Sequence, residues 1–357
     1  MRLNAVFTTL ALAATPLVAQ DAPESGGFIV RLGTDTIVVE RFARTASRLE
    51  GEYLARAPRT VLRRWGAALA PDGAITRFEM TSQRLGEPGS APEPVALEFS
   101  GDRAGIIPFV GNSWALLEQA VRRWRATGAA HATQRMLPPG EDDLMSISLE
   151  RRGGDSVTVT IFDGNPNAVR TDEVGRVLGV NGFGQLTVER LPALDMAPLA
   201  ASFAFRPLGM LSPRDTARAE VAGAHIAVDY SRPSRRGRTV FGGIVPWDRV
   251  WRTGANTATT LITDADLVIG GTNVPAGRYS LYTIPGPAGW TLIINRDADQ
   301  SGTEYNAARD LARVTMRVET LPQLVEQFTI AIEPRGNRGV LQLEWETTRA
   351  WVEITGK

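Results

Sequence analysis

The chain has 357 residues. A single hydrophobic core seldom serves a chain of this length, so we expect two domains. Hydrophobic residues make up 43% of it and charged residues 22%, which is typical of globular proteins and argues against fibrous or disordered ones. The 39 basic and 39 acidic residues cancel, which argues against nucleic acid as a partner, and the lack of cysteine excludes disulfides, thiolate metal sites and a cysteine nucleophile.

Residues 1–20 have the pattern of a signal peptide. Arg2 supplies a short positive region, residues 10–14 lie in an apolar stretch, and Ala19 is a small residue suited to cleavage. A cysteine that could carry a lipid anchor is absent. We therefore expect a periplasmic or secreted bacterial protein that is not lipidated and is not inserted in the membrane after the signal is cleaved.

Residues 21–200 are expected to form a β-rich N-terminal domain. Short β-prone runs alternate with turns, and residues 86–94 form a long exposed loop between two of them. The β-prone runs are 28–30, 36–39, 75–80, 95–99, 146–149, 156–162 and 185–189. This pattern predicts an antiparallel sheet, curved or half-closed, with one helix packed on it.

The predicted helix carries four apolar residues at helical spacing: Trp114, Leu117, Val121 and Trp124. Asn112 or Ser113 is suited to cap its beginning, and Gly128 follows its end. We interpret the apolar stripe as the face that packs against the sheet, since a ligand platform is the less common use of such a stripe.

Residues 198–213 are rich in proline and mark the expected boundary, and residues 207–357 should form a second domain. Gly270-Gly271 follows an apolar run and suits both central positions of a tight hairpin. Many short strands at regular spacing, with a short helix at 307–312, favour a C-terminal β-sandwich.

Several ordered motifs in this second half are similar to a bacterial family. They are Asp229-Tyr230-Ser231-Arg232-Pro233-Ser234-Arg235-Arg236-Gly237-Arg238, Phe241-Gly242-Gly243, Val250-Trp251-Arg252-Thr253-Gly254-Ala255-Asn256, Pro275-Ala276-Gly277, Tyr279-Ser280-Leu281-Tyr282-Thr283-Ile284-Pro285-Gly286 and Gly302-Thr303-x-Tyr305. Together they resemble domain of unknown function 2911 (DUF2911), found in exported proteins, over about residues 207–355. The resemblance implies compartment and fold class, because the family carries no assigned activity.

The usual catalytic and cofactor motifs do not occur in the sequence. The two histidines, His131 and His225, are not at metal-ligand spacing, and neither a nucleophile elbow nor a glycine-rich nucleotide fingerprint is present. Asp297 and Asp299 resemble the opening of a calcium loop that lacks its closing glutamate, so a polar turn is the better interpretation and a weak calcium site the alternative. We predict neither a metal site nor a cofactor.

An arginine cluster is the strongest candidate for a binding site. Four arginines lie within residues 232–238, interleaved with serine and glycine, and a guanidinium pairs well with carboxylate, phosphate or sulfate. The predicted ligand-binding residues are Asp229, Tyr230, Arg232, Arg235, Arg238, Arg252 and Asn256. The alternative is that these arginines pair with internal carboxylates such as Asp229, Asp248 or Asp264.

Three hypotheses for function remain open. The first is an exported, non-enzymatic binding or scaffold protein for an anionic or carbohydrate small molecule. Trp247 and Trp251, if exposed, would stack on sugar, although core packing is the more common role of tryptophan. The second is an envelope hydrolase that acts on a glycan or phosphoester through carboxylates and arginines. The third is a carrier of an apolar ligand in the half-closed first sheet, for which a deep apolar pocket would be the discriminating feature.

Overall fold

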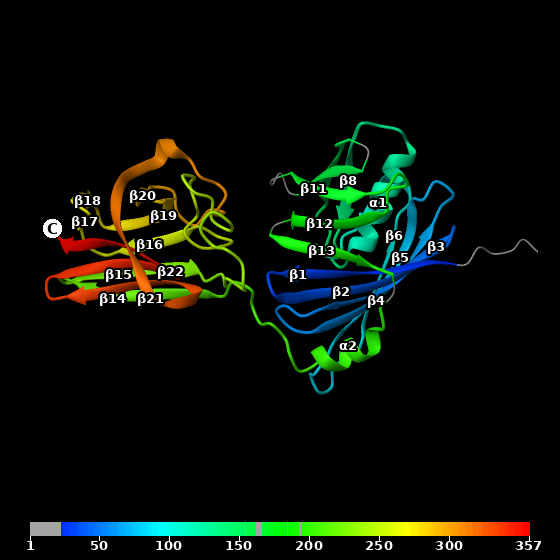
Figure 1. Ribbon diagram of the computed structural model, residues 1–357, viewed down its shortest axis with the longest axis horizontal. Helices are drawn as coiled ribbons and strands as arrows, with labels where there is room; N and C mark the ends of the chain where they lie inside the picture. The colour runs from blue at the N-terminus through cyan, green and yellow to red at the C-terminus, as the bar shows by residue number, and fades with distance from the viewer. Residues whose placement is uncertain (1–22, 154, 162–165, 184, 193) are drawn as a thin grey trace, which may run out of the picture.

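The computed structural model describes residues 23–153, 155–161, 166–183, 185–192 and 194–357. It shows a mainly β protein with two sheets, as predicted, and Figure 1 shows them in separate lobes joined by an extended segment. We refer to residues 24–203 as the N-terminal lobe and to residues 214–356 as the C-terminal lobe. The predicted signal peptide lies outside the described residues. No helix within the described ranges combines the length and the apolar character that spanning a membrane requires.

The N-terminal lobe contains one sheet of thirteen strands. These are β1 (Glu24–Leu32), β2 (Asp35–Arg44), β3 (Arg48–Ala55), β4 (Val61–Leu69), β5 (Ile75–Arg84), β6 (Glu93–Glu98), β7 (Ile107–Pro108), β8 (His131–Leu137), β9 (Met145–Arg151), β10 (Ser156–Ile161), β11 (Asn167–Thr171), β12 (Val177–Phe183) and β13 (Leu186–Leu191). The strand order is β6-β5-β4-β3-β2-β1-β13-β12-β11-β10-β9-β8-β7, and every pair is antiparallel except β7 with β8. The pairing of β1 with β13 thus joins two meanders into one open sheet.

Helix α1 (Trp114–Ala126) packs on one face of this sheet, where the main core of the lobe lies. Ser113 is the residue before its first turn and Gly128 follows its end with φ of 76°, so the predicted helix and its boundaries are confirmed. The expected capping role is not, because the Ser113 side chain makes no hydrogen bond to the helix amides. Apolar side chains from strands on both sides of the β1–β13 pair contact the same core. The sheet therefore curves around α1, which gives the half-closed form expected from the sequence.

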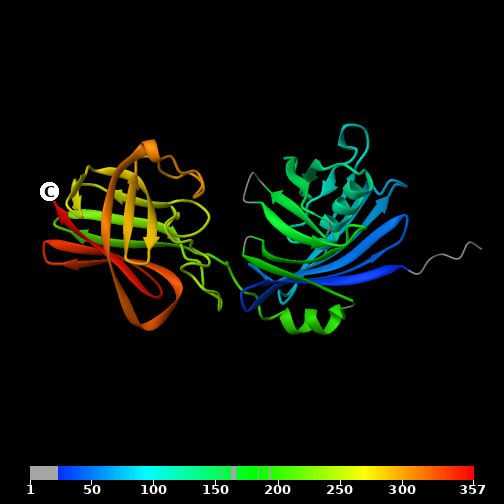
Figure 2. The ribbon, with the colours of Figure 1, turned by 45° about the horizontal axis from the view of Figure 1, so that its top comes forward.

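A second helix, α2 (Met196–Phe203), was missed by the sequence prediction. It packs on the opposite face of the sheet, because Val39 and Leu54 contact it whereas their chain neighbours Val38 and Tyr53 belong to the α1 side. Figure 2 shows α2 below the sheet, away from α1. Pro198 was interpreted as a boundary signal, but it occupies the first turn of α2, where a proline costs no hydrogen bond.

The C-terminal lobe contains nine strands in one antiparallel sheet. These are β14 (Arg214–Val221), β15 (Ala224–Ser231), β16 (Thr259–Thr263), β17 (Leu267–Ile269), β18 (Thr272–Val274), β19 (Gly277–Gly286), β20 (Gly289–Asn295), β21 (Asp310–Arg335) and β22 (Arg338–Gly356). The order is β14-β15-β16-β19-β20-β21-β22-β17-β18, and strands from both ends of this order share one core. The two layers of the sandwich are thus parts of a continuous sheet, connected through the long strands β21 and β22 (Figure 2).

Two local predictions for this lobe had different outcomes. Gly270 and Gly271 connect β17 to β18 with φ of 53° and 83°, as the tight hairpin requires. The helix predicted at 307–312 is wrong: residues Ala307–Arg309 form one 3-10 turn. The turn ends there because Asp310 already pairs with Asn295 of β20 and begins β21.

Candidate functional site

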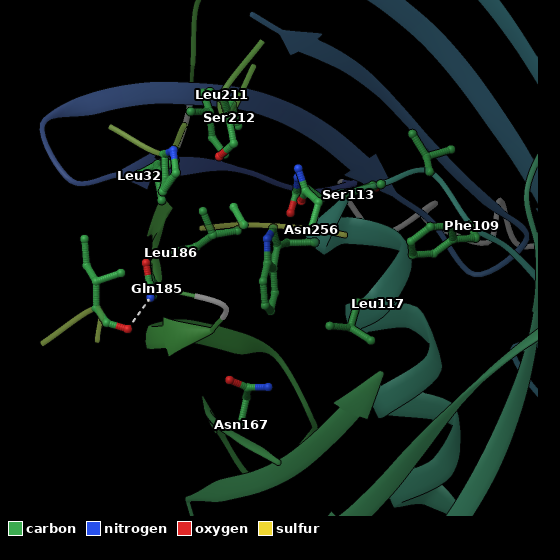
Figure 3. A pocket seen from close by; sticks show the side chains of 18 of the residues that line it. Leu32, Phe109, Ser113, Leu117, Asn167, Gln185, Leu186, Leu211, Ser212 and Asn256 are labelled. Carbon is green, nitrogen blue, oxygen red and sulfur yellow. Dashed lines mark hydrogen bonds between the residues drawn. The ribbon is translucent and has the colours of Figure 1, made fainter. Parts of the chain in front are cut away.

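A cavity of about 830 Å³ lies between the two lobes. Its walls come from α1 and the core face of the first sheet on one side, and from loops of the C-terminal lobe on the other. Figure 3 shows side chains from both lobes around it, including Leu117, Gln185 and Asn256. We call it the interlobe cavity. Its volume lies within the range of small-molecule sites, roughly 300–1,000 Å³.

The N-terminal wall of the interlobe cavity is largely apolar. Leu117 lies one helical turn from Trp114 on α1 and faces the cavity, as Figure 3 shows. Ile147 of β9 and Leu186 of β13 contribute from strands far from α1 in the chain. The helical stripe assigned to packing thus has two uses, because Trp114 is buried whereas Leu117 is only partly covered.

The buried carboxylate of Glu40 holds the beginning of α1. It accepts hydrogen bonds from the Ser113 hydroxyl at 2.5 Å and from the amides of Trp114 and Ala115 at 2.8 and 3.0 Å. These amides are among the helix donors that lack a partner within the helix. Burial raises the pKa of Glu40 to about 7, and the nearby charge of Glu118 acts in the same direction, against the hydrogen bonds. Glu40 therefore fixes the end of α1 that borders the cavity.

A second buried carboxylate, Glu118, attaches the middle of α1 to the sheet. It accepts a hydrogen bond from the Val177 amide at 2.9 Å and pairs with the guanidinium groups of Arg190 and Arg122. Arg122 lies 3.2 Å away on the same helix and also pairs with Glu24 of β1 at 2.6 Å. The two glutamates restrict both the position and the rotation of the helix that carries Leu117 and Trp114.

The C-terminal wall is built on residues 251–256, which we call the tryptophan loop. Trp251 exchanges two backbone hydrogen bonds with Thr283 of β19, at 2.7 and 2.9 Å. Its ring stacks on Trp345 at a centroid distance of 6.0 Å and meets Phe328 edge-on at 5.1 Å. Thr253 has φ of 52°, which is unusual for a β-branched residue, and its buried hydroxyl contacts Thr283 at 3.2 Å. The loop is therefore held in one conformation.

Arg252 projects from this loop at the cavity. It is partly buried, and its one hydrogen bond to another described residue runs from Nη1 to the Asn256 carbonyl oxygen at a long 3.5 Å. No described carboxylate lies within ion-pair distance of it. Burial lowers the pKa of Arg252, and no neighbouring charge acts against this effect.

Contacts between the lobes surround the cavity. The turn between β1 and β2 reaches the arginine loop, residues 232–238: the Thr34 amide donates to the Arg236 carbonyl oxygen at 2.9 Å, and the Arg236 guanidinium pairs with Asp35. Gly33 has φ of 60°, and a Cβ atom there would lie 1.9 Å from the same carbonyl oxygen. Gln185 accepts a hydrogen bond from Arg238 at 2.6 Å. It also donates one to the Ile244 carbonyl oxygen at 3.2 Å, which is the dashed line in Figure 3.

The structure divides the seven predicted ligand-binding residues into two groups. Arg238, Arg252 and Asn256 line the interlobe cavity, whereas Asp229, Tyr230, Arg232 and Arg235 do not. Asp229 accepts a hydrogen bond from Thr216, and Tyr230 is 1% exposed, with its hydroxyl donating to the Ile330 carbonyl oxygen.

Internal carboxylates neutralise part of the arginine loop, although not the ones proposed from the sequence. Arg232 pairs with Asp215 at 3.0 Å and Arg235 with Glu346 at 3.1 Å. The partners come from β14 and β22, which the chain brings alongside the loop only in the folded sheet. These two arginines therefore have a structural role in the described conformation.

The other residues considered from the sequence lie apart from the cavity. His225 pairs with Asp264 at 2.8 Å on the surface, which raises the pKa of the imidazole through that hydrogen bond. Asp297 pairs with Arg309 and Asp299 with Arg278, which fits the polar turn. Among the described residues, no group of three or more histidine, aspartate or glutamate side chains is placed to hold a metal ion.

The expectation of two exposed tryptophans is half wrong. Trp247 is 39% exposed, but Trp251 is only 8% exposed, because Trp345, Phe328 and Trp290 pack around its ring. Trp251 lines the cavity together with Trp345 of the same aromatic cluster. A sugar-stacking surface made of the two rings side by side is therefore not present.

Sequence reasoning missed Glu40, Gln185 and the apolar wall. Glu40 left a signal, since it occupies an inward position of β2 between the core residues Val38 and Phe42, where the period of two predicts an apolar side chain. A charged residue in such a position must find buried partners. Gln185 left none, because its role depends on the contact between the lobes.

Comparisons with known proteins agree with the sequence motifs. Residues 212–354 match the model of a family described as "Protein of unknown function (DUF2911)". The C-terminal lobe belongs to this family. No curated protein matches the chain.

The solved structures that match are only weakly similar, as two of them illustrate. A DUF1089 family protein from Pseudomonas aeruginosa has 15% identity and a TM-score of 0.33, over 50% of this chain and 97% of that one. The binding domain of botulinum neurotoxin DC, solved in complex with rat synaptotagmin II, has 7% identity and a TM-score of 0.15, over 93% of this chain and 77% of that one.

Proposed function

We propose that the protein is a non-enzymatic carrier or binding protein that holds an apolar or amphiphilic small molecule in the interlobe cavity. The observation that supports this proposal is the cavity itself, with its volume of about 830 Å³ and its largely apolar wall on the side of α1. Leu117, Ile147 and Leu186 converge there from three separate elements. An apolar chain that binds there gains about 25 cal/mol of free energy for each Å² of apolar surface removed from water.

The presence and lining of the cavity favour a carrier over the two other hypotheses. A hydrolase that uses a carboxylate pair needs acidic side chains at the ligand, and the two charged residues in the described lining are arginines. A scaffold needs no cavity. We also propose that the protein acts outside the cytoplasm, on the basis of the predicted signal peptide.

The test of this function is saturable binding of a simple amphiphile. Titration calorimetry with laurate and with dodecanol, both below their aggregation concentrations, should show binding of one molecule for each protein. Trp114, Trp251 and Trp345 line the cavity, so binding should also change the tryptophan fluorescence.

Two variants locate the bound molecule. Leu117→Trp places a bulky indole ring in the cavity and should weaken binding strongly. The control is Leu178→Trp on β12, an exposed leucine outside the cavity lining, which should leave binding unchanged. The proposal is wrong if neither amphiphile binds, or if both variants bind as well as the wild type.

A further inference from the structure

We infer that the ligand is an anionic amphiphile whose negatively charged head group, a carboxylate or a phosphate monoester, contacts Arg252 while its apolar chain lies against α1. This inference rests on the proposed function, since it concerns the same cavity. The charge distribution of the cavity carries it. The two charged side chains in the described lining, Arg252 and Arg238, are both positive and both belong to the C-terminal lobe.

The environment of Arg252 differs from that of the arginine loop. Arg232, Arg235 and Arg236 each pair with a carboxylate, whereas Arg252 has none among the described residues. A partly buried guanidinium without a carboxylate partner loses hydration, and the single long hydrogen bond to the Asn256 carbonyl oxygen compensates for little of this loss. An anion in the cavity would supply that interaction through charge-assisted hydrogen bonds.

The position of Arg252 is fixed before any ligand binds. The neighbouring residue on each side is held, Trp251 by its backbone bonds to Thr283 and Thr253 by burial of its side chain. The stem of Arg252 packs on Gly302, where a Cβ atom would lie 2.4 Å from the arginine Cδ. Because the side chain is already ordered, binding an anion requires little further loss of conformational entropy.

Arg238 adds a second positive charge on the same wall. Its guanidinium donates to the carbonyl oxygens of Arg235 and Ser234 at 2.9 and 2.6 Å and to the Gln185 amide oxygen at 2.6 Å. These acceptors are neutral, so they position the guanidinium without cancelling its charge. The positive wall faces the apolar wall across the cavity, which orients the ligand with its head group toward the C-terminal lobe.

The first experiment compares head groups on one alkyl chain with the wild-type protein. Laurate, dodecyl phosphate, dodecanol and dodecylamine are titrated by calorimetry at a pH at which laurate is ionised. We expect the two anions to bind about tenfold to a hundredfold more tightly than dodecanol, as a charge-assisted contact implies, and dodecylamine to bind least. If dodecanol binds as tightly as laurate, the inference is overturned and the proposed function stands. If none of the four binds, the proposed function itself fails.

The second experiment assigns the effect to Arg252. Arg252→Met keeps the aliphatic stem that packs on Gly302 and should reduce laurate affinity to that of dodecanol, while leaving dodecanol binding unchanged. Arg252→Lys should recover part of the preference for laurate. The control is Arg249→Met, an exposed arginine three residues away that does not line the cavity. Equal preference for laurate in Arg252→Met and in the wild type would refute the role of Arg252.

Discussion

The buried Glu40 should make the stability of the protein decrease as the pH rises. Burial raises its pKa in the folded state from the ordinary 4.5 to about 7. Between these two values the folded protein keeps a proton that the unfolded chain has released, so the free energy of unfolding falls with increasing pH. The raised pKa corresponds to about 3 kcal/mol, since one pKa unit is worth about 1.4 kcal/mol.

The assay is urea denaturation of the wild type and of Glu40→Gln at several pH values between about 4.5 and 8. The glutamine side chain still accepts hydrogen bonds from the Trp114 and Ala115 amides but carries no charge at any pH. We expect the wild type to lose about 3 kcal/mol across this range and the variant to lose much less. The control is Glu150→Gln, at an exposed position of β9, which should follow the wild type.

The other titrating groups act on different parts of the profile. The pKa of His225 is raised by Asp264, so its contribution is present below the unfolded value of 6.5 and is lost at higher pH in both proteins. The pKa of Asp264 is lowered by the same contact, so its contribution is lost only below 3.8, outside the range of the assay. Parallel profiles for the wild type and Glu40→Gln, or wild-type stability that rises with pH, would refute the reasoning.

Three further predictions follow from the contacts described above. Arg235→Ala should lower the free energy of unfolding measured in urea by about 1–2 kcal/mol, because it leaves the partly buried Glu346 unpaired. Added phosphate or sulfate should have the same effect on the melting temperatures of this variant and of the wild type. The fragment 207–357, which carries a core of its own, should unfold cooperatively on heating; a gradual loss of signal would contradict this. Mass spectrometry of the fractionated cell should find a soluble envelope protein that begins near Gln20 or Asp21, and an intact chain in the cytoplasm would argue against the signal peptide.

The sequence predicted those parts of the fold that depend on neighbours in the chain. Helix α1 followed from apolar spacing and from Ser113 and Gly128 at its ends, and the β17–β18 hairpin followed from Gly270-Gly271. In each case the signal lies within a few residues, although the hydrogen bonds that cap α1 come from the distant Glu40. Helix α2 was missed because one local signal, Pro198, favours both a helix beginning and a boundary.

The candidate site could be predicted only in part, because its geometry depends on pairing between distant segments. Arg232 and Arg252 have the same chemistry in the sequence, and they differ only because β14 places Asp215 beside the first and no described carboxylate lies beside the second. The cap of α1 joins residues 73 and 74 positions apart, Glu40 with Ser113 and Trp114. Such partners are fixed by strand register and by the contact between the lobes.

The two walls of the interlobe cavity come from different parts of the chain, and this limits what either part reveals alone. The DUF2911 match covers residues 212–354, which supply Arg238 and Arg252, while residues 24–203 supply the apolar wall around Leu117. Under the proposed function, the C-terminal lobe selects the charge of the ligand and the N-terminal lobe selects its chain. An isolated C-terminal lobe would then keep its arginines and lose the apolar area that holds the chain. Under this proposal, family resemblance in one lobe does not by itself specify the ligand, because residues of both lobes line the cavity.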